Sequence, residues 1–252
     1  TGGRRGLLLS MPGCTAAGAI AAEQAADSMD SVEYEIAWIA HSIDGMTAST
    51  TPEDAANASA ANAAAFWTDG CFSYAIDGAS VTYTLDDCAG PFELAGVSGM
   101  VTITYRESGA SYGFDIVATD LMIHATTVSF MVSGDVSTDG RNVNVTTSGS
   151  AIGRRNHMIS HTGAYSLQWN GSSQCAGIDS GTWDTTVNGD TFTTTVTNWR
   201  RCGTTGCPAA GGTISFSGPA AFVTLTYDGT RQVAWTSGAG GSGTVTLFCT
   251  EG

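Results

Sequence analysis

The chain has 252 residues and a formal net charge of −14, and hydrophobic residues make up 42% of it. This length and apolar content predict a folded chain with a sizeable core and exclude a disordered one. The nine basic residues, all arginine, face 23 carboxylates. Nucleic acid and anionic lipid surfaces would repel such a protein, so we expect no nucleic-acid partner.

The first fourteen residues have the form of a truncated export signal. Arg4 and Arg5 precede a short apolar run of leucines, and a glycine stands directly before Cys14. The hexapeptide Leu-Ser-Met-Pro-Gly-Cys (9–14) resembles the lipobox of bacterial lipoproteins, although Met11 and Pro12 depart from the usual residues. In that family the cysteine becomes the first mature residue and carries the lipid. The resemblance therefore implies a signal remnant at 1–14 and lipidation of Cys14.

The other six cysteines all follow residue 70, and their even number in an exported chain predicts three disulfides. Cys71 and Cys88 flank one predicted hairpin and are expected to pair. Spacing then leaves two alternatives. The favoured one closes the short loop between Cys202 and Cys207 and joins Cys175 to Cys249. The competing one pairs Cys175 with Cys202 and Cys207 with Cys249.

Residues 15–70 are expected to form a helical N-terminal segment. Within 16–44, apolar residues recur at spacings of three and four and predict a helix with one apolar stripe. A second helix should begin after Thr51, a capping residue followed by proline and two carboxylates, and run to about Phe66. No apolar run reaches the ~18 residues of a membrane-spanning helix, so membrane attachment is expected only through a lipid on Cys14.

Residues 71–252 are expected to form an antiparallel β-domain. Alternating apolar and polar residues mark thirteen segments, many separated by Asp-Gly or Asn-Gly pairs, which are typical of tight hairpins. The predicted strands are 72–77, 80–86, 98–106, 113–123, 126–136, 141–152, 158–169, 181–188, 191–200, 212–217, 221–228, 231–236 and 243–249. Such short connections demand antiparallel neighbours, so the fold class is mainly β with N-terminal helices: a large, disulfide-stapled meander, either a curved sheet, barrel-like or a sandwich.

No set of residues predicts a catalytic or metal centre. Residues 109–113 match the G-x-S-x-G pattern around Ser111, but a strand follows where that motif needs a helix. On a strand His157 and His161 would stand ~13 Å apart, too far to share a metal. Residues 135–140 resemble the start of a calcium loop whose closing carboxylate is replaced by Thr146. We therefore expect no catalytic residue, metal or cofactor.

Four tryptophans fall on predicted strands and offer either ordinary core packing, the favoured interpretation, or an exposed platform for sugars. They are Trp169, Trp183, Trp199 and Trp235.

The sequence predicts an exported, lipid-anchored envelope protein, of the outer membrane or extracellular, with a non-enzymatic binding or structural role. Two alternatives stay open: a carrier or sensor of an apolar small molecule or lipid, and a secreted hydrolase. A carrier requires an apolar cavity, and a hydrolase requires a histidine beside a carboxylate or serine in a cleft. An apolar ligand and a polysaccharide are the expected kinds of partner.

Overall fold

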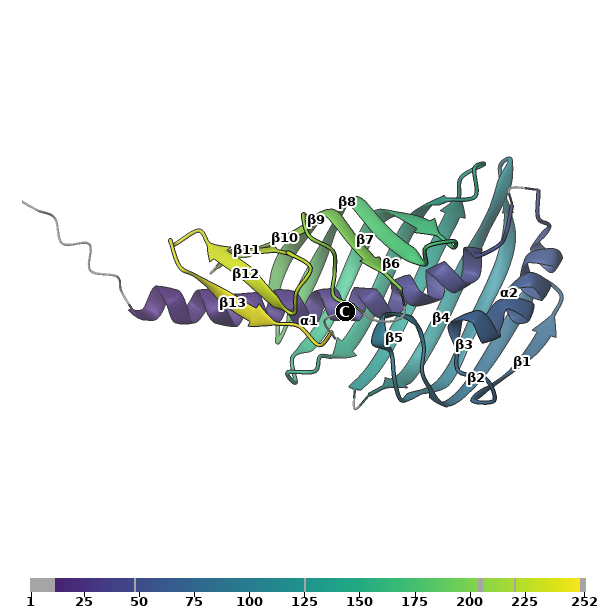
Figure 1. Cartoon of the computed structure of the whole chain (residues 1–252), viewed down its shortest axis with the longest axis horizontal. Coiled ribbons are helices and arrows are strands. Elements are labelled where there is room, and N and C mark those ends of the chain that lie inside the picture. Colours follow the sequence, from purple (N-terminus) through teal and green to yellow (C-terminus); the bar gives the residue numbers. More distant parts are fainter. Residues whose placement is uncertain (1–11, 48, 125, 204–205, 220, 250–252) are drawn as a thin grey trace, which may run out of the picture.

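Two helices and one large sheet make up the protein in the computed structural model, which describes residues 12–47, 49–124, 126–203, 206–219 and 221–249 (Figure 1). The two α-helices are α1 (Pro12–Ile43) and α2 (Pro52–Phe66), and a short 3₁₀ turn, η1, covers Pro91–Glu93. The strands are β1 (Phe72–Asp77), β2 (Ser80–Cys88), β3 (Val97–Ser108), β4 (Ser111–Ile123), β5 (Thr126–Val136), β6 (Asn142–Ile152), β7 (Met158–Asn170), β8 (Cys175–Val187), β9 (Asp190–Cys202), β10 (Thr213–Ser217), β11 (Phe222–Thr226), β12 (Gln232–Ser237) and β13 (Ser242–Thr246). All thirteen predicted strands are present, but β8 begins at Cys175, six residues before the predicted start at 181.

The thirteen strands pair in strict chain order to form one antiparallel meander. Hairpin chemistry explains this order: Asn188 and Gly189 join β8 to β9 with φ of 52° and 96°. A two-residue hairpin with a type I′ turn requires positive φ at both central residues. β1 and β13 each pair on one side, so the sheet stays open.

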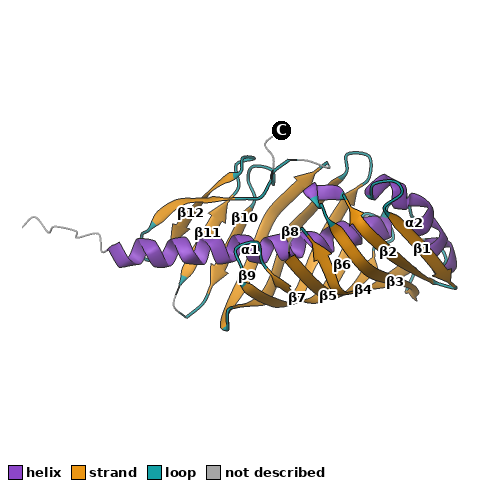
Figure 2. Ribbon diagram, turned by 90° about the horizontal axis from the view of Figure 1, so that it is seen from below, coloured by secondary structure: helices purple, strands orange, loops and turns teal. Residues whose placement is uncertain are grey.

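The helix α1 lies along the inner face of the curved sheet, and the strands cross it obliquely (Figure 2). It contacts β4–β8 and β10–β13. Between Gln24 and Ile43 all its residues except Asp30 are buried. The prediction of a single apolar stripe is therefore wrong, because the sheet wraps around this part of the helix and leaves no solvent-exposed face for its polar residues.

The second helix begins as its sequence predicts and packs against α1 and β1–β3. Thr51 caps it by accepting a hydrogen bond from the Asp54 amide at 3.2 Å, with proline in the first turn. Both helices and the sheet share one continuous core. None of the helices in the described ranges combines the length and the apolar content that crossing a bilayer requires.

Three disulfides join Cys71 to Cys88, Cys175 to Cys202 and Cys207 to Cys249. The favoured pairing of Cys202 with Cys207 is wrong and the competing alternative is confirmed. Cys175 and Cys202 are directly opposite each other in the β8–β9 ladder, with 4.0 Å between their Cα atoms. Three such bonds indicate an oxidising compartment outside the cytoplasm.

Candidate functional site

Two carboxylates of α1 are buried in separate pairs, one with His157, which directly precedes β7, and one with His161 of β7. The Asp27 side chain accepts a hydrogen bond from Nδ1 of His157 at 2.9 Å and forms an ion pair with Arg155. Eight residues further along, Oε1 of Glu35 lies 2.7 Å from Nε2 of His161. The two carboxylates are eight helical residues apart, a distance of ~12 Å along the axis, and the two histidines are four extended residues apart, ~13 Å. These nearly equal spacings allow both pairs to form together.

The Glu35 pair is sealed from solvent. Neither the Glu35 nor the His161 side chain is more than 1% exposed, and Oγ1 of Thr147 donates a second hydrogen bond to Glu35 at 2.6 Å. Burial by itself lowers the pKa of His161, but the Glu35 charge and hydrogen bond outweigh it and hold that pKa above its ordinary value. This buried pair stabilises the packing of α1 against the sheet.

A second polar cluster joins α1 to the end of β9 and to η1. Glu33 forms a buried ion pair with Arg201, whose Nη2 also donates to the Phe92 carbonyl at 3.0 Å. Burial and the neighbouring Glu33 raise the pKa of Asp30 to about 7. The enclosed space here, about 10 Å³, is enough for roughly one water molecule. It cannot hold an apolar ligand.

His41 lies in a third buried network. Its Nδ1 accepts a hydrogen bond from the Trp67 indole at 3.0 Å, and its Nε2 lies 3.1 Å from the Ser59 carbonyl and 3.3 Å from the Tyr83 hydroxyl. Burial lowers the pKa of His41 to about 4, so the ring is neutral at physiological pH. His41 thus belongs to the core.

The other candidate residues fall into structural positions. Ser111 opens β4 opposite Ser108 in a hairpin, as its context predicts. Asp135 accepts a hydrogen bond from Arg106 at 2.7 Å, and Asp139 accepts one from the Arg141 amide at 2.9 Å within the β5–β6 turn. The two carboxylates therefore bind different partners. Among the described residues no group of three or more His, Cys, Asp or Glu could hold a metal ion.

The four strand tryptophans are all buried, which confirms core packing and leaves no exposed indole platform: Trp169, Trp183, Trp199 and Trp235. Cys14 lies in the first turn of α1, and its side chain, like residues 1–11, lies outside the described part of the chain.

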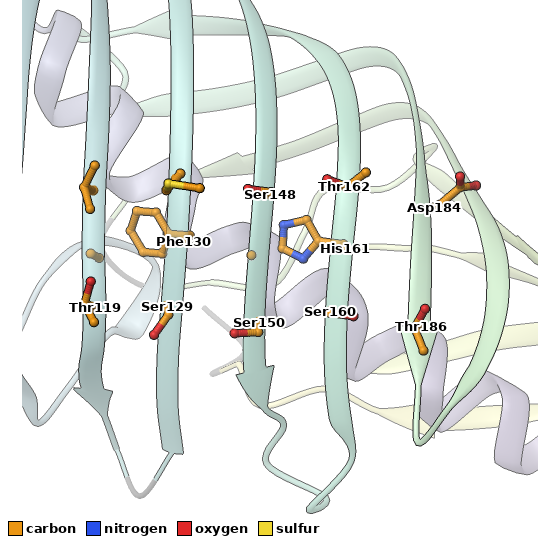
Figure 3. A pocket seen from close by; sticks show the side chains of 14 residues that line it. Thr119, Ser129, Phe130, Ser148, Ser150, Ser160, His161, Thr162, Asp184 and Thr186 are labelled. Atoms are coloured by element: carbon orange, nitrogen blue, oxygen red, sulfur yellow. The ribbon is translucent and has the colours of Figure 1, made fainter.

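An open groove lies on the outer face of the sheet, which we define as the face turned away from α1. This groove has a volume of about 540 Å³, is here called the outer groove and crosses β4–β8, with His161 among the residues that line it (Figure 3). A smaller groove of about 340 Å³ adjoins it and shares Val117, Met131 and Ser148. Val117 and Met131 are 43% and 60% exposed and form an apolar wall between the two.

Small hydroxyl side chains form the floor of the outer groove. Register places Ser129 opposite Ser150, Ser150 opposite Ser160, and Ser160 opposite Thr186. A parallel row runs from Met131 through Ser148 and Thr162 to Asp184. Neighbouring strands lie ~4.8 Å apart, so the floor is a regular array of groups that both donate and accept hydrogen bonds.

Sequence reasoning missed this surface. The signal in the sequence was that the polar positions of most strands are Ser or Thr. Only the register of the sheet shows that those residues align across five strands. Comparisons with protein-family models, with curated proteins and with solved structures find no match to this chain.

Proposed function

We propose that this protein is an exported, lipid-anchored envelope protein that binds a ligand non-enzymatically through the outer groove. The observation that carries the binding role is the groove itself, an aligned array of exposed side chains on a rigid, disulfide-stapled sheet. The three disulfides support export. The lipobox-like sequence before Cys14 supports the anchor.

The two alternatives lack the features that they require. A carrier of an apolar molecule needs a cavity of roughly 300 Å³ or more, but α1 occupies the concave side of the sheet. A hydrolase needs its histidine within reach of a substrate. His41 and His161 are buried in the core, and His157 is held by Asp27. The fourth histidine, His124, is exposed and lines neither groove. The outer groove is lined by one exposed carboxylate, Asp184, and by His161, which is only 5% exposed and is paired with Glu35.

The anchor is tested by intact mass, before and after reduction, of protein taken from the membrane fraction of its native host. We expect a mature chain that begins at Cys14 and carries a lipid, and a mass gain of six hydrogens on reduction. An unmodified Cys14 in mature protein, recovered from the culture medium, would refute the anchor and leave the binding role standing.

The binding role is tested by retention on isolated host envelopes. Ser150→Trp places a bulky ring on the groove floor, and Ser217→Trp puts the same ring at an exposed outer-face position on β10, outside the groove. We expect Ser150→Trp to lose retention at least tenfold and Ser217→Trp to keep it. Equal retention of both variants would refute binding through the outer groove.

A further inference from the structure

The charge of the outer groove restricts its ligand to neutral or cationic molecules. No arginine lines either groove, whereas Asp184 lies in the larger one and Asp115 in the smaller. Arg106, which lies near Asp115, is already paired with Asp115 and Asp135 at 3.4 and 2.7 Å. With a net charge of −14 on the whole chain, a phosphate-, sulfate- or carboxylate-rich polymer would be repelled.

The backbone under the groove excludes recognition of an extended peptide by strand addition. Each strand from β4 to β8 is hydrogen-bonded to a neighbour on both sides. Added strands need the free N–H and C=O groups of a sheet edge, and here the edges are β1 and β13. A ligand in the groove must therefore be recognised by side chains.

Those side chains suit a ligand that is itself covered with hydroxyl groups. Ser129, Ser150 and Ser160 are short, so a ligand can approach the sheet closely. The hydroxyls of Ser150 and Ser160 can donate and accept, whereas the Ser129 hydroxyl already accepts from the Asp120 amide at 2.9 Å. Asp184 is exposed and can accept from a ligand hydroxyl in a charge-assisted bond. Met131 adds a flexible apolar surface for C–H groups. Lipid tails would find too little apolar enclosure in an open groove.

We infer that the ligand of the outer groove is a neutral glycan chain that lies across the strands from β4 to β8. This inference rests on the proposed function and names its ligand class. Five strands span ~19 Å, a length that accommodates several sugar rings. The serine row contacts the sugar hydroxyls, the wall of Val117 and Met131 contacts the apolar faces of the rings, and Asp184 binds at one end.

The test is affinity electrophoresis of the full chain through gels that contain dextran, laminarin or hydroxyethyl cellulose as neutral probes, and alginate as an anionic one. We expect retardation by at least one neutral glycan, with the dissociation constant raised at least tenfold by Ser150→Trp and unchanged by Ser217→Trp. Ser160→Trp serves as a second groove variant. Tryptophan fluorescence and the unfolding midpoint verify that each variant is folded.

Retardation by alginate but by no neutral glycan, or equal retardation of wild type and both groove variants, would overturn the inference. So would loss of envelope retention in Ser150→Trp while the neutral glycans neither bind nor compete for the envelopes. That last result would keep the proposed binding role and refute only its ligand class. Failure of both assays would refute the two together.

Discussion

Glu35→Gln tests whether the buried pair of Glu35 and His161 holds α1 inside the sheet. The substitution keeps the size of the side chain but removes a charge that lies 2.7 Å from the ring and is fully buried. Removing one partner of a buried pair costs ~3–5 kcal/mol, because the remaining charge is left without compensation. When the ring can lose its proton, the cost should fall towards ~1–3 kcal/mol, that of a lost buried hydrogen bond.

The pH dependence gives this prediction its sign. The folded-state pKa of His161 is raised by Glu35, so the pair contributes stability fully below the unfolded pKa of about 6.5. That contribution is lost as pH rises through the raised folded pKa. Glu35→Gln should therefore cost more free energy of unfolding at pH 6 than at pH 9.5.

The assay is guanidinium unfolding followed by tryptophan fluorescence at both pH values. Glu23→Gln is the matched control, because Glu23 lies on the same helix but is exposed. Its effect should stay within about 0.5 kcal/mol. The reasoning is refuted if Glu35→Gln costs no more than Glu23→Gln, or if its cost is the same at pH 6 and pH 9.5.

Three further changes test other parts of the core. Because burial lowers the pKa of His41 to about 4, this residue should lower the free energy of unfolding by about 3 kcal/mol between pH 7 and pH 4. His41→Gln should remove that part of the pH dependence, as measured by denaturant titrations at each pH. An unchanged pH dependence would contradict the assignment. Removing the bond between Cys207 and Cys249 by a double alanine substitution opens a loop of 42 residues and should cost about 4 kcal/mol, measured the same way, whereas a loss below 1 kcal/mol would show that the bond adds little. Gly149→Ala would place a Cβ 2.7 Å from the β7 histidine ring and should cost about 1–3 kcal/mol, against little change for Gly238→Ala, whose nearest neighbour would be 3.5 Å away; equal unfolding midpoints would refute this steric argument.

Local patterns were sufficient for most of the secondary structure of this protein, although they missed η1 and the first six residues of β8. The strand alternation of period two and the turn pairs such as Asn188-Gly189 depend on neighbouring residues alone, so all thirteen strands could be predicted from them. The start of α2 at Thr51 is local in the same sense. Short connections then forced each strand to pair with the next, which made the meander predictable as well.

Contacts between distant segments were beyond sequence reasoning. The short spacing of Cys202 and Cys207 favoured the wrong disulfide, because spacing cannot show that β8–β9 register sets Cys175 directly opposite Cys202. Likewise, nothing local distinguishes the buried Glu35 from the exposed Glu23 on one helix.

The sequence by itself therefore determined most elements of this protein, their order and the number of its disulfides, since these follow from neighbouring residues and from the cysteine count. Only the tertiary structure decided which residues meet across the sheet. Curvature of the open sheet placed it around α1 and buried two carboxylates of α1 beside His157 and His161. Register aligned the serines of β5, β6 and β7 into the floor of the outer groove, because a shift of one residue would have turned each of them to the other face.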